Sequence, residues 1–143
     1  MNKLNRLNKL KNLMKIHERE VLIEFKEAQQ INNRIRESIL DLEDHKNNSA
    51  SKMVNKEIIM NELNIVRNFN QKVDSAIEEL SKQLEMSDKV YASIAEKLKE
   101  AKKKSKSVEK LIHKEQSNFQ YEEESKRQRQ VDENITFGRQ SSN

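Results

Sequence analysis

Apolar residues recur every seven positions along most of the chain, in two interleaved series. The more regular pair of series runs from Ile59 to Phe119, where fourteen of eighteen positions are apolar. The first series is Ile59, Val66, Val73, Leu80, Ser87, Ile94, Ala101, Val108 and Glu115, and the second is Leu63, Asn70, Ile77, Leu84, Tyr91, Leu98, Ser105, Ile112 and Phe119. Steps of three and four residues place all of these side chains along one side of an α-helix, and such a stripe must pack against another helix.

An earlier helix is predicted from about residue 4 to residue 46. Its first apolar series holds six residues at strict seven-residue intervals: Leu7, Met14, Val21, Ala28, Ile35 and Leu42. Its second series is less regular, with Leu10, Ile31, Phe25 and Ile39 on either side of the first series and with His17 and Glu24 as interruptions. Such drift still gives one apolar face, but a broader one that packs less tightly.

The two helices are expected to fold back on each other through a turn at residues 47–54. Asn and Ser dominate this segment, and their side chains satisfy backbone groups at helix ends. A second helix would then run from Asn55, as the N-cap, to about residue 135, with a frayed tail at 136–143 after Gly138. The predicted fold is all-α, an elongated antiparallel two-helix coiled-coil hairpin forming a single domain over residues 1–143.

The second helix is predicted to be longer than the first and to overhang at its C-terminal end. Folding near residue 50 would pair residue i with about residue 101 − i, so the first helix would cover the second only as far as about Lys97. The apolar series continues beyond that point through Ala101, Val108, Ile112 and Phe119. Because each buried aliphatic side chain is worth roughly 1.5–3 kcal/mol, this uncovered segment is expected to bind another protein or a second copy.

Composition agrees with elongated helices rather than a compact core. Of 143 residues, 34% are hydrophobic and 36% are charged, with one Gly and neither Pro nor Trp. The absence of Cys excludes disulfides and thiolate chemistry, and no stretch has the length and apolarity of a transmembrane span. These features predict a soluble, intracellular protein.

Catalytic chemistry is not indicated. His17, His45 and His113 lie far apart, and none has a second His or a carboxylate at the spacing of a zinc motif. One Gly cannot build a phosphate-binding loop, and a two-helix hairpin forms no pocket in which carboxylates would acquire shifted pKa values. We therefore expect a protein that is not an enzyme and that needs no metal, cofactor or small-molecule substrate.

Two basic clusters, at residues 1–15 and 97–114, could be solvated surface or a binding face. An acidic protein, a nucleic acid or an anionic membrane could each be the partner. The lack of aromatic residues for base stacking argues against nucleic acid. The polar residues Asn70 and Ser87 in the apolar series either set the register of the coiled coil or are tolerated at its edge.

Several short motifs occur along this pattern: Leu4-x2-Leu7-x2-Leu10 at the start, Phe69-x3-Val73-x2-Ala76-Ile77-x2-Leu80 in the second helix, and Val131-Asp132-Glu133 near the end. Together with the length and the missing Cys and Pro, they resemble the FliJ/YscO family. These are the small stalk proteins of flagellar and injectisome type III export machines. The flagellar branch is preferred on length and on the Asp-Glu ending.

The resemblance implies a non-enzymatic, cytoplasmic component of a type III export apparatus, with a peripheral position at the inner face of the bacterial inner membrane. Its partners would be a hexameric export ATPase, which it regulates, the cytoplasmic domain of the export-gate membrane protein, and export chaperones. The gate contact would comprise Phe69, Val73, Ala76 and Leu80. The ATPase contact would comprise Lys3, Arg6, Lys9, Lys102, Lys103, Lys104, Val108, Ile112 and Phe119.

Two readings from other classes remain. One is a basic coiled-coil protein that binds nucleic acid or the nucleoid. The other is a holding chaperone of the prefoldin type, but residues 45–55 are too short for the β-hairpins that prefoldins insert between their helices, and they lack alternating β-branched residues.

Overall fold

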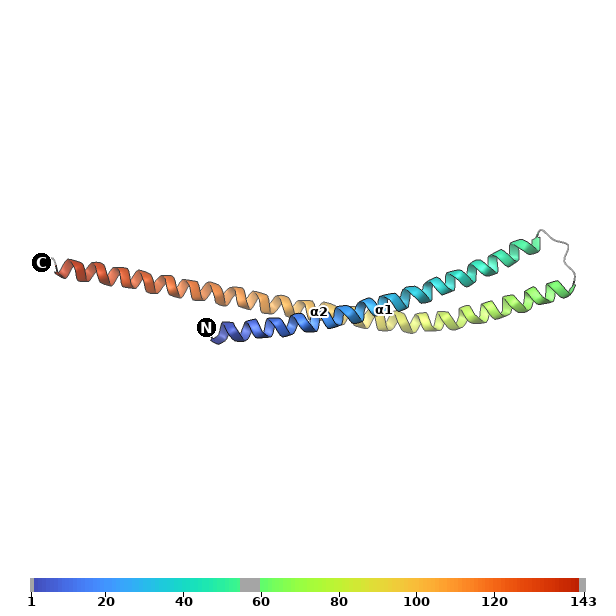
Figure 1. Cartoon of the computed structure of the whole chain (residues 1–143), viewed down its shortest axis with the longest axis horizontal. Helices are drawn as coiled ribbons and strands as arrows, with labels where there is room; N and C mark the ends of the chain where they lie inside the picture. The colour runs from blue at the N-terminus through green and yellow to red at the C-terminus, as the bar shows by residue number, and fades with distance from the viewer. Residues whose placement is uncertain (1, 55–59, 142–143) are drawn as a thin grey trace. The chain divides into compact units, whose positions relative to one another are not determined.

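The chain forms two helices, α1 (Asn2–Val54) and α2 (Met60–Ser141), shown in Figure 1. A computed structural model describes residues 2–54 and 60–141, and every residue in these ranges is helical. The predicted all-α, two-helix class is therefore confirmed. The helices pack as two compact units: unit 1 comprises Met1–Arg19 and Glu100–Asn143, and unit 2 comprises Glu20–Lys99.

In unit 2 the helices run antiparallel, because rising residue numbers in α1 meet falling numbers in α2. Three ion pairs trace this order: Glu24 with Lys97 at 3.2 Å, Arg36 with Asp88 at 3.1 Å, and Lys46 with Asp74 at 2.6 Å. A hydrogen bond between the seam residues Asn32 and Ser87 marks which positions lie opposite each other. In this register, residue i of α1 lies opposite about residue 119 − i of α2.

The predicted turn at 47–54 is wrong, because these residues belong to α1. An Asn or Ser in place of Ala costs a helix only about 0.5–0.7 kcal/mol, which packing readily offsets. Ser49 is half-buried one heptad after Leu42, and Lys46 is held by Asp74. The predicted helix start at Asn55, with Ile59, lies outside the described residues. At its other end α2 continues to Ser141, through Gly138 and into the segment predicted to fray.

The apolar seam predicted for α2 is confirmed from Leu63 to Glu115. Each position of the two series in that range is buried or half-buried. In unit 2 the buried apolar side chains are Val21 and Ala28 from α1 and Val73 and Leu98 from α2. Regular three- and four-residue spacing thus identified the packed face of α2 residue by residue.

The first apolar series of α1 is also packed, but the prediction of its second series is right for Phe25 and Ile39 and wrong for the other two residues. Leu10 and Ile31 are exposed. The positions that pack are Leu4, Lys11, Glu18, Phe25, Asn32, Ile39 and Lys46, which keep a strict seven-residue interval. Four of these seven are polar or charged, so the true second seam of α1 is hidden from a search for apolar residues alone.

In unit 1, the beginning of α1 covers α2 much further than predicted. Ion pairs join Lys15 to Glu109 at 3.0 Å and Lys3 to Glu115 at 3.5 Å. An overhang beginning near Lys97 is therefore wrong. The overhang exists, but it begins beyond Glu115, where Figure 1 shows α2 running past the N-terminal end of α1. Moving the turn by one residue along the chain changes the sum of the numbers of two paired residues by two. An error of a few residues in the predicted turn therefore moved the predicted start of the overhang about twice as far along α2.

Candidate interaction surfaces

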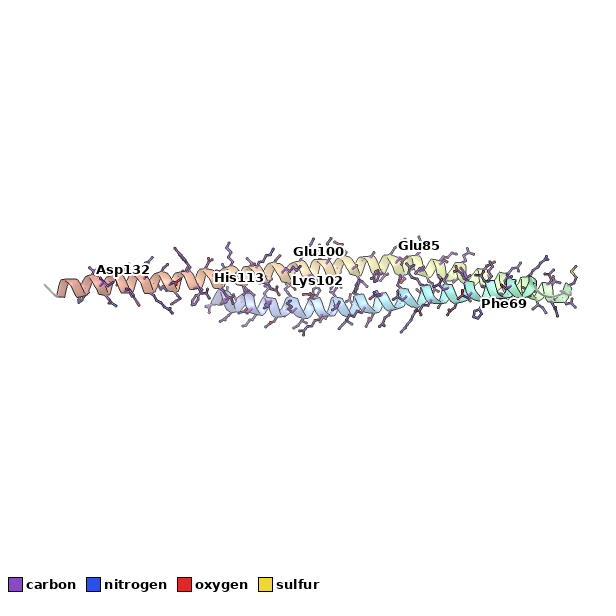
Figure 2. All side chains as sticks on the ribbon, turned by 90° about the horizontal axis from the view of Figure 1, so that it is seen from above. Phe69, Glu85, Glu100, Lys102, His113 and Asp132 are labelled. Atoms are coloured by element: carbon purple, nitrogen blue, oxygen red, sulfur yellow. The ribbon has the colours of Figure 1, made fainter. Side chains whose placement is uncertain are left out.

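A basic surface lies on unit 1, formed by the first residues of α1 and by α2 between residues 100 and 119. The three acidic residues that α2 contributes there are each already neutralised: Glu100 by Lys103, Glu109 by Lys15 and Glu115 by Lys3. Within residues 3–15 and 100–119, the exposed cations that have no ion pair are Arg6, Lys9, Lys102, Lys104, Lys106, Lys110 and Lys114. We call this set the basic face. Figure 2 labels one of its members, Lys102, and also His113, which lies on the same stretch of α2.

The Lys15–Glu109 pair shifts the pKa of both of its groups. The hydrogen bond from Lys15 and its positive charge lower the pKa of the Glu109 carboxyl below 4.5, and the same contacts raise the pKa of Lys15 above 10.5. Both groups are solvent-exposed, so water and salt screen the pair strongly. The pair orients α1 on α2 more than it stabilises their contact.

The residues predicted to contact an ATPase divide into two groups. Lys3, Arg6, Lys9 and the three lysines at 102–104 are exposed, and Phe119 is 38% exposed. Val108 and Ile112 are 6% and 7% exposed, since the start of α1 covers them. The exposed group can meet a partner directly, whereas Val108 and Ile112 cannot do so while α1 lies over them.

The residues predicted to contact an export gate also divide. Phe69 is 44% exposed and points away from the helix pair in Figure 2. Val73 is 5% exposed and Leu80 is half-buried, because both belong to the seam. Ala76 is half-buried at the edge of the seam. Ile65, one helical turn before Phe69, is an exposed neighbour that the motif did not include.

A polar cluster interrupts the seam of unit 2. Asn32, only 8% exposed, donates from Nδ2 to Ser87 Oγ at 3.3 Å and to Asp88 Oδ1 at 2.6 Å. Its Oδ1 accepts a hydrogen bond from Arg36 Nε at 2.9 Å. These contacts are made only in the observed register, which favours the register-setting interpretation of Ser87. Sequence reasoning missed Asn32, although it lies midway between Phe25 and Ile39 at seven-residue spacing.

The other polar interruption, Asn70, is less well satisfied. Its side-chain Oδ1 is buried and has no hydrogen-bond partner. The register places Ser49 opposite, so a polar position of α2 again faces a polar position of α1. Within unit 2, both polar positions of the α2 seam therefore lie opposite polar positions of α1 rather than large apolar ones.

Groups of three or more His, Asp or Glu placed to hold a metal ion do not occur in residues 2–54 and 60–141. His17, His45 and His113 are all exposed. Over the same ranges, neither helix is apolar enough for long enough to cross a bilayer.

The antiparallel helix pair and its polar cluster define a helical coiled-coil protein with an exposed basic face. Residues 2–142 match the family model described as Flagellar FliJ protein. The chain therefore belongs to the FliJ family, and membership implies a component of the flagellar export apparatus with a structural or regulatory role. Neither the curated proteins nor the solved structures include a significant match.

Proposed function

We propose that this protein is the stalk of the flagellar export apparatus, binding and regulating the hexameric export ATPase through unit 1 and docking on the export gate through unit 2. The family match supports the apparatus, and the basic face supports the ATPase contact. Export chaperones are further candidate partners, for which the exposed end of α2 beyond Glu115 offers free surface.

The basic face is the observation that carries the ATPase contact. The seven cations of the basic face make no ion pair, and the three acids that α2 contributes to this surface are already matched. Such a field attracts an acidic partner and accelerates its association, and the attraction weakens as salt shortens the Debye length to about 8 Å at physiological ionic strength. Phe119, exposed at the edge of this face, adds an apolar anchor.

Charge reversal tests the ATPase contact. Replacing Lys102→Glu and Lys104→Glu together should weaken stimulation of the hexameric ATPase by at least about tenfold in apparent affinity, because each side chain changes from attraction to repulsion. The control replaces Lys82→Glu and Lys89→Glu, two exposed lysines of unit 2, and makes the same change in net charge. Equal stimulation by both variants would contradict the assignment of the basic face.

The gate contact is tested at Phe69. Phe69→Ala should weaken binding to the soluble domain of the export gate by about five- to thirtyfold, roughly 1–2 kcal/mol, since an exposed aromatic anchor contributes through its buried area on binding. Met86→Ala removes a more exposed apolar side chain from the same unit and serves as the control. If Phe69→Ala binds like the control, the gate contact lies elsewhere.

The basic face also makes nucleic acid the second candidate partner. Phosphate contacts would give binding that falls steeply with salt. A DNA mobility shift at low salt that the Lys102→Glu, Lys104→Glu variant abolishes would support this function. The absence of any shift at low salt would end it.

A further inference from the structure

We propose that residues 2–19 of α1, here called the N-terminal arm, open from α2 as a separate local unit and thereby act as a removable cover. The covered surface is the part of the α2 seam formed by Ala101, Ser105, Val108 and Ile112. This inference concerns unit 1 alone and does not depend on which partner the protein binds.

The side of the arm that faces α2 is poorly suited to a tight coiled coil. Its five seam residues are Leu4, Leu7, Lys11, Met14 and Glu18. None of them is fully buried, whereas the four α2 residues that they cover are all between 4% and 7% exposed. Coiled coils place large apolar side chains at such positions, so Lys11 and Glu18 leave the arm with only three apolar anchors.

Closing the arm also leaves two polar atoms without partners. Glu18 Oε2 and Ser105 Oγ are both buried and make no hydrogen bond. A buried polar atom without a partner has lost its hydrogen bonds to water and gained none in return, so opening restores what closing removed. Both atoms lie in the contact between the arm and α2, where they favour the open state.

The polar contacts that hold the arm closed are weak. Lys3–Glu115 joins an exposed lysine to a half-buried glutamate, and Lys15–Glu109 joins two side chains that are each 43% exposed. Ion pairs that water reaches in this way contribute little and are screened by salt. Unit 2 is held differently, by the fully buried Val21, by the tilted contact of the Phe25 and Tyr91 rings with centroids 5.1 Å apart, and by the hydrogen bonds of Asn32. The arm should therefore open at a lower free energy than α1 within unit 2.

Opening would change the surface that the protein presents. Ala101, Val108 and Ile112 would join Phe119, which is already partly exposed, in one continuous apolar seam on α2. The uncovered part of α2 would then begin near residue 100 instead of beyond Glu115. The arm thus controls how much of α2 is available as a single helix.

Amide hydrogen exchange on the full chain tests the proposal. In the wild-type protein, amides of residues 4–18 should exchange at least about tenfold faster than those of residues 21–46. Helix ends fray in any protein, so a pair of variants isolates the seam. Lys11→Leu with Glu18→Leu converts the two charged seam positions, and Lys9→Leu with Glu20→Leu makes the same two exchanges on exposed positions.

The two variants have the same composition and the same net charge. The seam variant should slow exchange in the arm by at least about tenfold, whereas the control should change it by less than about twofold. A wild-type arm as protected as residues 21–46 would overturn the proposal. Equal slowing in the two variants would also overturn it, because it would trace the effect to helix propensity rather than to the seam.

The seam variant is more apolar and could slow exchange by associating with a second copy, so a second measurement tests the arm without added apolar residues. The chain has no cysteine, so Leu7→Cys with Ile112→Cys introduces a single possible pair. Both positions lie in the seam of unit 1, between the ion pairs Lys3–Glu115 and Lys15–Glu109. Oxidation should form an intramolecular disulfide and slow exchange in the arm by at least about tenfold relative to the reduced protein. Failure to form the disulfide, or exchange unchanged by it, would overturn the proposal.

Discussion

The buried amide of Asn32 should stabilise unit 2 measurably, and Asn32→Ala is the change that tests it. The substitution removes the 2.6 Å hydrogen bond to the Asp88 carboxylate, the longer one to Ser87, and the one accepted from Arg36. A hydrogen bond to a charged group is worth about 1.5–3 kcal/mol and a neutral one about 0.5–1.5 kcal/mol. Asp88 is about half exposed and keeps its ion pair with Arg36, so the first value is at the low end of its range.

Two further contributions adjust this sum. Ala is the better helix former by about 0.6 kcal/mol, which offsets part of the loss. Ser87 remains in the seam without the amide donor. The expected net loss is about 1.5–3 kcal/mol, which for a chain of this size lowers the unfolding midpoint by roughly 4–9 °C.

Asn33→Ala is a matched control, since it makes the same substitution one residue further along on the exposed side of α1. Thermal and urea unfolding followed by circular dichroism should show the control to be as stable as the wild type or slightly more stable, and Asn32→Ala to be clearly less stable. If the two variants unfold at the same temperature, the polar cluster contributes no net stability and the argument from its hydrogen bonds fails.

Three more predictions follow from the packing. Asn32→Leu should raise the unfolding midpoint but allow additional helix pairings. Light scattering would then show dimers in the variant beside the single species of the wild type. If the variant keeps that single species, Asn32 does not set the register. Val73→Ala should cost about 1–3 kcal/mol because its side chain is buried, whereas Phe69→Ala should change stability by less than about 0.5 kcal/mol, both measured by urea unfolding. Lys15→Gln should raise the pKa of the Glu109 carboxyl, as followed by NMR titration, because Lys15 is what lowers it. A carboxyl whose pKa is lowered by folding stabilises the folded state at pH values above its unfolded pKa, near 4.5, and this contribution is lost as the pH falls through its folded pKa. The ion pair should therefore stabilise the protein at neutral pH and not in acid. An unchanged Glu109 pKa in the variant would refute the contact.

Local spacing alone determined much of this protein. Between Leu63 and Glu115 the two series of α2 were identified position by position, and the six-residue series of α1 was identified correctly as well. Helical geometry explains this success, because residues three and four apart share a face whatever the rest of the chain does. The basic clusters were also visible directly, since charge is a property of composition.

The tertiary structure alone decided where α1 ends, which residues of α2 it covers and which polar residues meet. Asn and Ser at 47–51 differ from good helix formers by only tenths of a kcal/mol, so local preference could not separate a turn from a further turn of helix. Packing made that choice, and the register amplified it, moving the free end of α2 from about Lys97 to beyond Glu115. In the sequence, Asn32 is only a polar interruption of the apolar face of α1. Its role is seen once α2 brings Ser87 next to it, because the hydrogen-bond partner of this buried side chain lies on the other helix.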